Sequence, residues 1–126
     1  MISHVHSATI IVDNQDTALD FYVNTLGFEK VIDQPMGPEM RFITVVPNGA
    51  TTQIALALAS WAGGSATRGG ETGISYITHD IDATYKTLSE RGVRFKGPVE
   101  DMPWGDRATW FYDIDDNEFF LNEIRK

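Results

Sequence analysis

Short apolar segments separated by polar turns follow one another along this chain of 126 residues, and their order occurs twice. An alternating or continuous apolar run of about six residues is typical of a strand, whereas apolar residues three and four apart are typical of a helix facing a core. In the first copy, strands are predicted near residues 5–12, 28–33, 41–47 and 53–59. In the second, they are predicted near 73–78, 93–97, 107–113 and 118–124.

One helix is predicted in each copy, directly after the first strand. Asn14 and Asp80 stand where helix N-caps belong, and Asp16 and Asp82 follow in the first turns, where the helix dipole favours a carboxylate. Gly27 is expected to end the first helix, and Gly92 plays the same part in the second. The apolar stripes that face the core are Ala18, Leu19, Tyr22 and Leu26 in the first helix and Ile81, Tyr85 and Leu88 in the second.

The two copies are offset by about 66 residues, as between Arg41 and Arg107. We predict one α+β domain over residues 1–126, with unit one at about 1–59, a Gly-rich linker at 60–72 and unit two at about 73–126. Each unit has the order strand, helix, three strands, and neither can close a core alone. Their two curved mixed sheets are expected to enclose a shared cleft.

The segment 53–59 predicts which face of its strand meets the helix. Large residues at 54, 56 and 58 alternate with alanines at 55, 57 and 59. Large side chains suit the face packed under the helix, whereas small ones leave room for a cavity on the other face.

Composition excludes several classes of function. The net charge is −8 and the basic residues are scattered, which argues against a nucleic-acid partner. There is no cysteine, so disulfides and thiolate metal sites are excluded and a reducing cytoplasm is the expected location. Because the longest apolar runs are only as long as a strand, no membrane span is expected.

Three segments carry a family resemblance: Val12–Phe28, with Leu-Gly-Phe closing the helix; Asp80–Val93, with Arg-Gly-Val at its end; and Asp113–Leu121. Together they resemble the vicinal oxygen chelate superfamily, which includes glyoxalase I, bleomycin-resistance proteins and extradiol dioxygenases. The last is similar to the family's Asp-Pro-Asp-Gly-Asn turn, with Ile114 and Asp116 in place of Pro and Gly. The resemblance covers nearly the whole chain and implies the fold described above.

The resemblance also implies where metal ligands would stand. Members that bind a metal carry His, Gln or Glu at positions that correspond here to Ser7, Gln53, Gly73 and Phe120. Only Gln53 could serve as a ligand, so we predict that no metal or other cofactor is bound. Other possible ligands lie nearby, but they could take these positions only if the strands shifted in register: His6, Glu118 and Glu123. A shift by one residue turns a side chain to the other face of the sheet.

A small-molecule site is the alternative use of the cleft. Candidate ligand-binding side chains on the strands are Ser7, Thr9, Gln53, Ala55, Ser75, Phe120 and Asn122. Trp104, in a Pro-Trp-Gly loop, and Trp61, in the linker, are candidate aromatic walls. Trp104 could instead pack on a partner subunit. Arg107 could anchor an anion, although pairing with an acidic neighbour is the commoner use of an arginine in so acidic a chain.

Three functions remain open at this point. The first is metal-free binding of a small, partly aromatic or apolar molecule, as in the bleomycin-resistance group. The second is a metal-dependent lyase, isomerase or dioxygenase of the same superfamily, and the third is a non-catalytic structural or regulatory dimer. The resemblance implies a homodimer, because units pair across the dimer in the bleomycin-resistance group.

Overall fold

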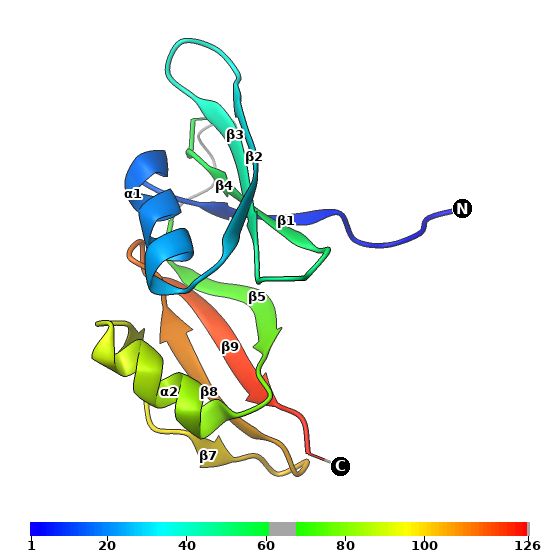
Figure 1. Ribbon diagram of the computed structural model, residues 1–126, viewed down its shortest axis with the longest axis vertical. Coiled ribbons are helices and arrows are strands. Elements are labelled where there is room, and N and C mark those ends of the chain that lie inside the picture. The colour runs from blue at the N-terminus through cyan, green and yellow to red at the C-terminus, as the bar shows by residue number, and fades with distance from the viewer. Residues whose placement is uncertain (61–67, 126) are drawn as a thin grey trace. The chain divides into compact units, whose positions relative to one another are not determined.

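In the computed structural model the chain forms two compact units, residues 1–68 and 69–126, of which residues 1–60 and 68–125 are described. Each unit contains one mixed sheet with a helix against one face (Figure 1). The predicted α+β class, built from two strand–helix–three-strand units, is confirmed. No helix in the described residues is long and apolar enough to cross a membrane.

Unit one has a four-stranded sheet in the order β1-β4-β3-β2. Strands β1 and β4 are parallel, whereas the β3–β4 and β2–β3 pairs are antiparallel. The elements are β1 (Ser7–Ile11), α1 (Gln15–Asp20), η1 (Phe21–Thr25), β2 (Glu29–Pro35), β3 (Arg41–Val46) and β4 (Gln53–Ala57).

The first helix begins as the sequence predicts, but its second half is wider than an α-helix. The side chain of Asn14 accepts a hydrogen bond from the Thr17 N–H at 2.9 Å, which caps α1. From Phe21 the backbone forms a π-helical turn, η1, in which the Leu26 N–H donates to the Phe21 carbonyl at 3.0 Å. Gly27, with φ of +80°, ends the segment in the left-handed conformation expected of it.

Unit two has the strand order β5-β9-β8-β6, with β7 pairing with β8 beyond β6. Here β5 and β9 are the parallel pair, as β1 and β4 are in unit one. The elements are β5 (Gly70–Ile77), α2 (Ile81–Glu90), β6 (Arg94–Phe95), β7 (Glu100–Asp101), β8 (Arg107–Tyr112) and β9 (Asn117–Glu123).

Strand β5 starts three residues before the predicted position and takes over the end of the predicted linker. Gly70 and Glu71 pair with Asn117 and Glu118, and the register then shifts before Ser75 pairs with Phe120. The hydroxyl of Thr72 donates to the Glu118 carbonyl at 2.8 Å. Gly69, Gly70 and Gly73 therefore supply positive φ angles at and within an irregular strand.

The sheet of unit two has two unlike faces. The Arg107 side chain is 2.8 Å from Asp82 of α2, and the Glu123 carboxylate accepts from the Ile81 N–H at 3.0 Å. Odd-numbered residues of β8 and β9 therefore face α2, where Phe111 and Phe119 are buried in the core. Even-numbered residues of β8 and β9 lie on the opposite face. The equivalent face of unit one, opposite α1, carries Thr9, Thr44 and Ala55, which adjoin in the register.

The turn before β9 is held by a buried carboxylate. Asp113 is 1% exposed and accepts hydrogen bonds from the backbone N–H groups of Asp115 and Asn117, at 2.8 and 3.0 Å. Asp116 lies in the left-handed region, with φ of +63°. The Asp113 carboxylate therefore fixes the backbone of the turn that resembles the family's Asp-Pro-Asp-Gly-Asn turn.

Candidate functional site

An aromatic pair forms the floor of a hollow on the face of the unit-two sheet opposite α2. The rings of Trp110 and Phe120 lie 4.8 Å apart, with their planes inclined by 52°. Both are half-buried, so part of each ring remains open to a ligand. The hollow has an empty volume of about 380 Å³. Its lining, which defines the unit-two hollow, is Glu71, Gly73, Ile74, Ser75, Trp110, Glu118 and Phe120.

The register shift in β5 leaves the hollow open on one side. Gly73 lies within the shifted stretch, with φ of +74°, and a Cβ placed there would meet nothing within 4 Å. Ser75 is the next residue on this side of β5 and is exposed. A glycine and a serine therefore stand where larger side chains would fill the space above Phe120.

A buried carboxylate closes one end of the hollow. Glu118 is 7% exposed, and its Oε1 lies 3.3 Å from Nζ of Lys96. Its Oε2 is also buried and has no described donor in hydrogen-bonding geometry, although the side chain of Tyr112, its partner in the register, interacts with the carboxylate. A buried acceptor without a donor is costly, so this oxygen is suited to a donor supplied by a ligand.

Asp106 links two of the sequence-predicted residues. Its Oδ2 accepts from Nε1 of Trp104 and from Nδ2 of Asn122, each at 3.1 Å, and its Oδ1 accepts from the Arg125 N–H at 2.9 Å. The Arg125 N–H, then the Asn122 and Trp104 donors, hold the pKa of Asp106 below its ordinary value. Trp104 is 62% exposed, so Asp106 orients an indole that lies largely in solvent.

Unit one presents a smaller, apolar pocket on the face opposite α1. Thr9 and Ala55 are partners in the register, as are Ser7 and Gln53. The pocket has an empty volume of about 260 Å³, and its lining includes Thr9, Ala55 and the two methionines Met36 and Met40. Ala55 and Ala57, two of the small residues on this strand, line the pocket, and so does the large Leu56.

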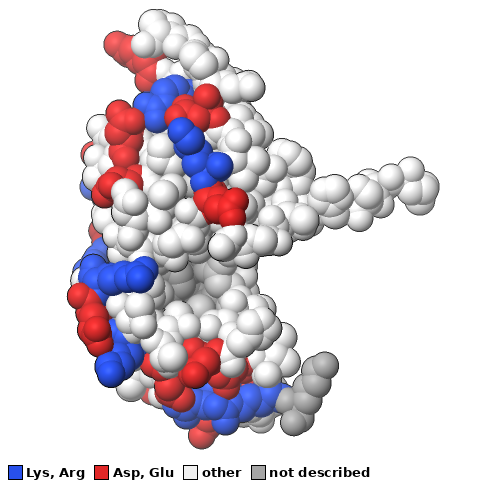
Figure 2. Space-filling model, viewed as in Figure 1, with Lys and Arg blue, Asp and Glu red and all other residues white. Residues whose placement is uncertain are grey.

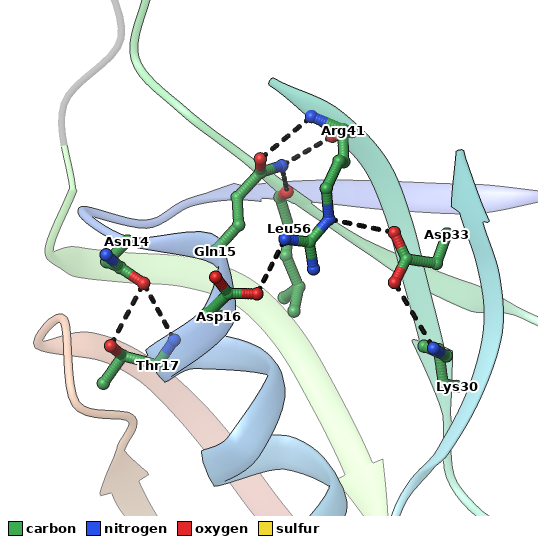
Figure 3. Close-up of polar contacts among 8 residues, drawn as sticks. All are labelled: Asn14, Gln15, Asp16, Thr17, Lys30, Asp33, Arg41 and Leu56. Carbon is green, nitrogen blue, oxygen red and sulfur yellow. Dashed lines mark hydrogen bonds and ion pairs between the residues drawn. The ribbon is translucent and has the colours of Figure 1, made fainter. Parts of the chain in front are cut away.

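Arg41 and Arg107 are both engaged in ion pairs on the helix side of their sheets. Arg107 lies 2.8 Å from Asp82 and 3.1 Å from Asp101. Arg41 lies 2.7 Å from Asp16 and 3.0 Å from Asp33 (Figure 3). Figure 2 likewise shows basic side chains next to acidic ones over the described part of the face drawn. Pairing with acidic neighbours, the commoner use weighed from the sequence, is therefore what both arginines show.

The structure brings together some of the predicted site residues and separates others. Ser75 and Phe120 share the unit-two hollow, and Asn122 lies on the same face two residues farther along β9. Arg107 is on the other face of that sheet. Ser7, Thr9, Gln53 and Ala55 belong to unit one, and Trp61 lies outside the described residues.

Three important residues were not predicted for the site: Trp110, Glu118 and Asp106. The signal for Glu118 and Trp110 is the alternation of side chains along a strand. Glu118 stands two residues from Phe120, so it shares the face of Phe120 and no register shift is needed to place it there. The sequence interpretation, which treated it as a shifted alternative, was wrong on this point. Asp106 gives no such signal, because it lies in a loop.

The residues at the superfamily's ligand positions do not fit a divalent metal. Gly73 has no side chain, Phe120 offers only a ring, and Ser7 is a poor ligand. In the part of the chain that the structure describes, no three His, Asp or Glu side chains are grouped as a metal site requires. We therefore derive no chemistry through a metal ion.

Comparison with known proteins identifies the family. The model of the Glyoxalase/Bleomycin resistance protein/Dioxygenase superfamily matches residues 2–121. A protein named YetH from Bacillus subtilis (strain 168) is 32% identical over 123 residues, which are 98% of this chain and 100% of YetH.

Two solved structures are similar over 98% of both chains. A member of the same superfamily from Sphaerobacter thermophilus DSM 20745 is 65% identical, with a TM-score of 0.94. TnmS3 from Streptomyces sp. CB03234, described as an antibiotic-binding protein, is 39% identical, with a TM-score of 0.85. The chain belongs to the glyoxalase/bleomycin resistance protein/dioxygenase superfamily.

Proposed function

We propose that the protein binds a small, partly aromatic or apolar molecule in the unit-two hollow and acts by sequestering it. The observation that carries the proposal is the half-buried Trp110–Phe120 pair, which floors a hollow on the sheet face opposite α2. Stacking and burial on one such aromatic face supply about 1–3 kcal/mol of binding free energy. TnmS3, an antibiotic-binding protein, supports the proposal through 39% identity along nearly the whole chain.

The predicted residues of unit two that the structure describes have distinct parts in this proposal. Ser75 and Asn122 would orient the ligand over Phe120, and Trp104 would cover an outer edge. In unit one, the pocket beside Thr9 and Ala55, with Ser7 and Gln53 on the same two strands, is a separate candidate site for a small apolar molecule. Because Arg107 is held by Asp82 and Asp101, we give it a positioning role for β8 rather than a ligand contact.

The test is a titration with a panel of flat aromatic antibiotics, followed by Trp fluorescence and by the shift in melting temperature. A ligand that binds only the folded state raises the melting temperature by mass action. Ser75→Leu fills the hollow from an exposed position and should abolish binding without loss of stability. Ser89→Leu, at an exposed position on α2, is the matched control and should bind normally.

Two results would count against sequestration in the hollow. Equal binding by the wild type and by Ser75→Leu would place the ligand elsewhere. A chemically altered ligand, seen by mass spectrometry after incubation and release, would replace sequestration by catalysis.

We also propose a homodimer in the cytoplasm, on the strength of the family resemblance and the cysteine-free composition. Sedimentation at micromolar concentration should give twice the mass of the 14.0 kDa chain. A stable monomer would contradict the dimer.

A further inference from the structure

We infer that the ligand of the unit-two hollow is a flat aromatic cation with hydrogen-bond donors at two of its edges, such as a ring carrying protonated or amino nitrogens. This inference rests on the function proposed above and narrows the class of ligand. Its basis is a row of alternate side chains on β9: Glu118, Phe120 and Asn122. An aromatic ring here lies between two side chains that each have a buried acceptor oxygen with no described donor in hydrogen-bonding geometry.

The orientation of Asn122 follows from its neighbour. An ionised carboxylate only accepts hydrogen bonds, so the side-chain group that faces Asp106 must be the NH₂ of Asn122, 3.1 Å away. The amide oxygen is then turned away from Asp106. Asn122 is 8% exposed, and its Oδ1 makes no hydrogen bond to the described residues. Asn122 is outside the lining of the hollow, but it lies on the same face two residues beyond Phe120, so its unpaired oxygen is an acceptor next to this end of the hollow.

The other end of the row offers a charged acceptor. Oε2 of Glu118 is buried and has no described donor in hydrogen-bonding geometry, whereas Oε1 is paired with Lys96 at 3.3 Å. The side chain of Tyr112, on the neighbouring strand, also interacts with this carboxylate. Glu71 is a second carboxylate in the lining, and Lys96, which interacts with both carboxylates, is half-exposed. Arg94, the next cation along, is held by Asp116 at 2.5 Å. Two carboxylates against one lysine leave the hollow negative, so it favours a cation.

The spacing of the two acceptors favours an extended, planar ligand. Residues 118 and 122 are four positions apart on one strand, which is about 13 Å along β9. The Phe120 ring lies between them, with Trp110 4.8 Å away. A cationic ring above aromatic faces gains a cation–π attraction in addition to stacking. Donors at both ends of a flat fused ring would then meet Asn122 and Glu118.

A matched pair of probes tests the inference. Proflavine (3,6-diaminoacridine) is cationic at neutral pH and has amino groups at both ends of a flat ring. Acridine has the same ring without the amino groups and is neutral. In titration calorimetry with the full chain, proflavine should bind at least about tenfold more tightly than acridine. The reason is that the binding free energy of one hydrogen bond to a charged group corresponds to about a tenfold change in the dissociation constant.

The variants assign the preference to the row. Glu118→Gln keeps the shape and removes the charge, and it should reduce the preference for proflavine about tenfold while leaving acridine binding unchanged. Asn122→Leu should weaken proflavine binding and spare acridine. Glu90→Gln makes the same change of net charge at an exposed position on α2 and should leave both affinities as in the wild type.

Each outcome decides something. If both probes bind equally well, or if Glu118→Gln keeps the full preference, the inference is overturned while the binding function stands. If neither probe binds, the inference fails, and the titration with the antibiotic panel then decides whether the proposed function fails with it. Should Glu118→Gln not fold, Glu71→Gln at the exposed side of the lining is the second variant, and an unchanged preference there would also overturn the inference.

Discussion

The side chain of Gln15 links two strands where their own pairing has stopped, and its removal is a direct test of what holds unit one together. The β3–β4 register extends only over Thr44–Ala55 and Val45–Ile54. Beyond it, Nε2 of Gln15 donates to the carbonyls of Arg41, at 2.6 Å, and Leu56, at 2.8 Å. Oε1 accepts from the Arg41 N–H at 3.1 Å (Figure 3).

The expected cost of Gln15→Ala follows from the groups that are left without partners. Gln15 is 7% exposed, so water replaces its amide poorly at this position. Three backbone groups lose a hydrogen bond, and net losses of about 0.5–1.5 kcal/mol each give a decrease of about 2–4 kcal/mol in the free energy of unfolding. For a chain of this length, such a change lowers the melting temperature by roughly 10 °C.

Urea unfolding followed by circular dichroism measures this difference, with Gln34→Ala as the control. Gln34 is an exposed glutamine in β2, and its replacement should change the unfolding free energy by less than about 0.5 kcal/mol. If Gln15→Ala fell within the same small range, the reasoning that the amide bridges the divergent strands would be wrong. A lower m-value in the variant would instead mean that unit one no longer unfolds together with the rest.

Three further predictions concern unit two. The pKa of Asp106 is held below its ordinary value of 3.8, so the stability that its charged form contributes is present above that pH and is lost as pH falls through the lowered pKa. The difference in melting temperature between the wild type and Asp106→Asn should therefore shrink in acid. A difference that stays constant with pH would contradict this. Arg107→Met should lower the free energy of unfolding by less than Gln15→Ala does. The decrease should be smaller at high salt, because the carboxylates paired with Arg107 are exposed. A decrease that does not depend on salt would argue against ion pairing. Asp116→Gly relieves the backbone strain at φ of +63° but also removes the exposed ion pair with Arg94. At high salt, where that pair contributes little, it should raise stability by about 1 kcal/mol, and an unchanged or lower melting temperature there would refute this.

The scaffold could be predicted from the sequence because its signals are local and occur twice. Asn14 and Asp80 cap their helices as expected, and each accepts a hydrogen bond from the N–H three residues later. The short strands follow from alternation and from turn residues, which depend on neighbours in sequence only. The π-helical turn at Phe21–Thr25 was missed because one extra residue in a turn hardly alters an apolar stripe.

The site was harder to predict because it depends on register between distant segments. Ser75 meets Phe120 only after the shift in β5, and no local pattern marks where such a shift falls. From the sequence alone, Trp110 cannot be told from the aromatic residues of the core, and only its pairing with Phe120 places it on the face of the hollow. Trp104 was predicted from its loop, but the carboxylate that orients it, Asp106, is identified only by the three hydrogen bonds it accepts.

The duplication itself separates the parts of the chain that hold the fold from the parts that diversify. Arg41 binds Asp16 in unit one, and Arg107 binds Asp82 in unit two, at positions offset by the same 66 residues. Both pairs join a strand to the first turn of the helix, so each unit needs them for the same mechanical reason.

The sheet faces opposite the helices do not need matching residues in the two units. Thr9 pairs with Ala55 in the parallel strands of unit one, and the equivalent pair in unit two is Ser75 with Phe120. An alanine there gives a small apolar pocket, whereas a phenylalanine beside Trp110 gives an aromatic floor bordered by carboxylates. Substitutions in the ion pairs should therefore change stability similarly in either unit, whereas Ser75→Leu should change binding and leave stability intact. The copy whose face became aromatic and acidic is thus the one in which to look for the ligand.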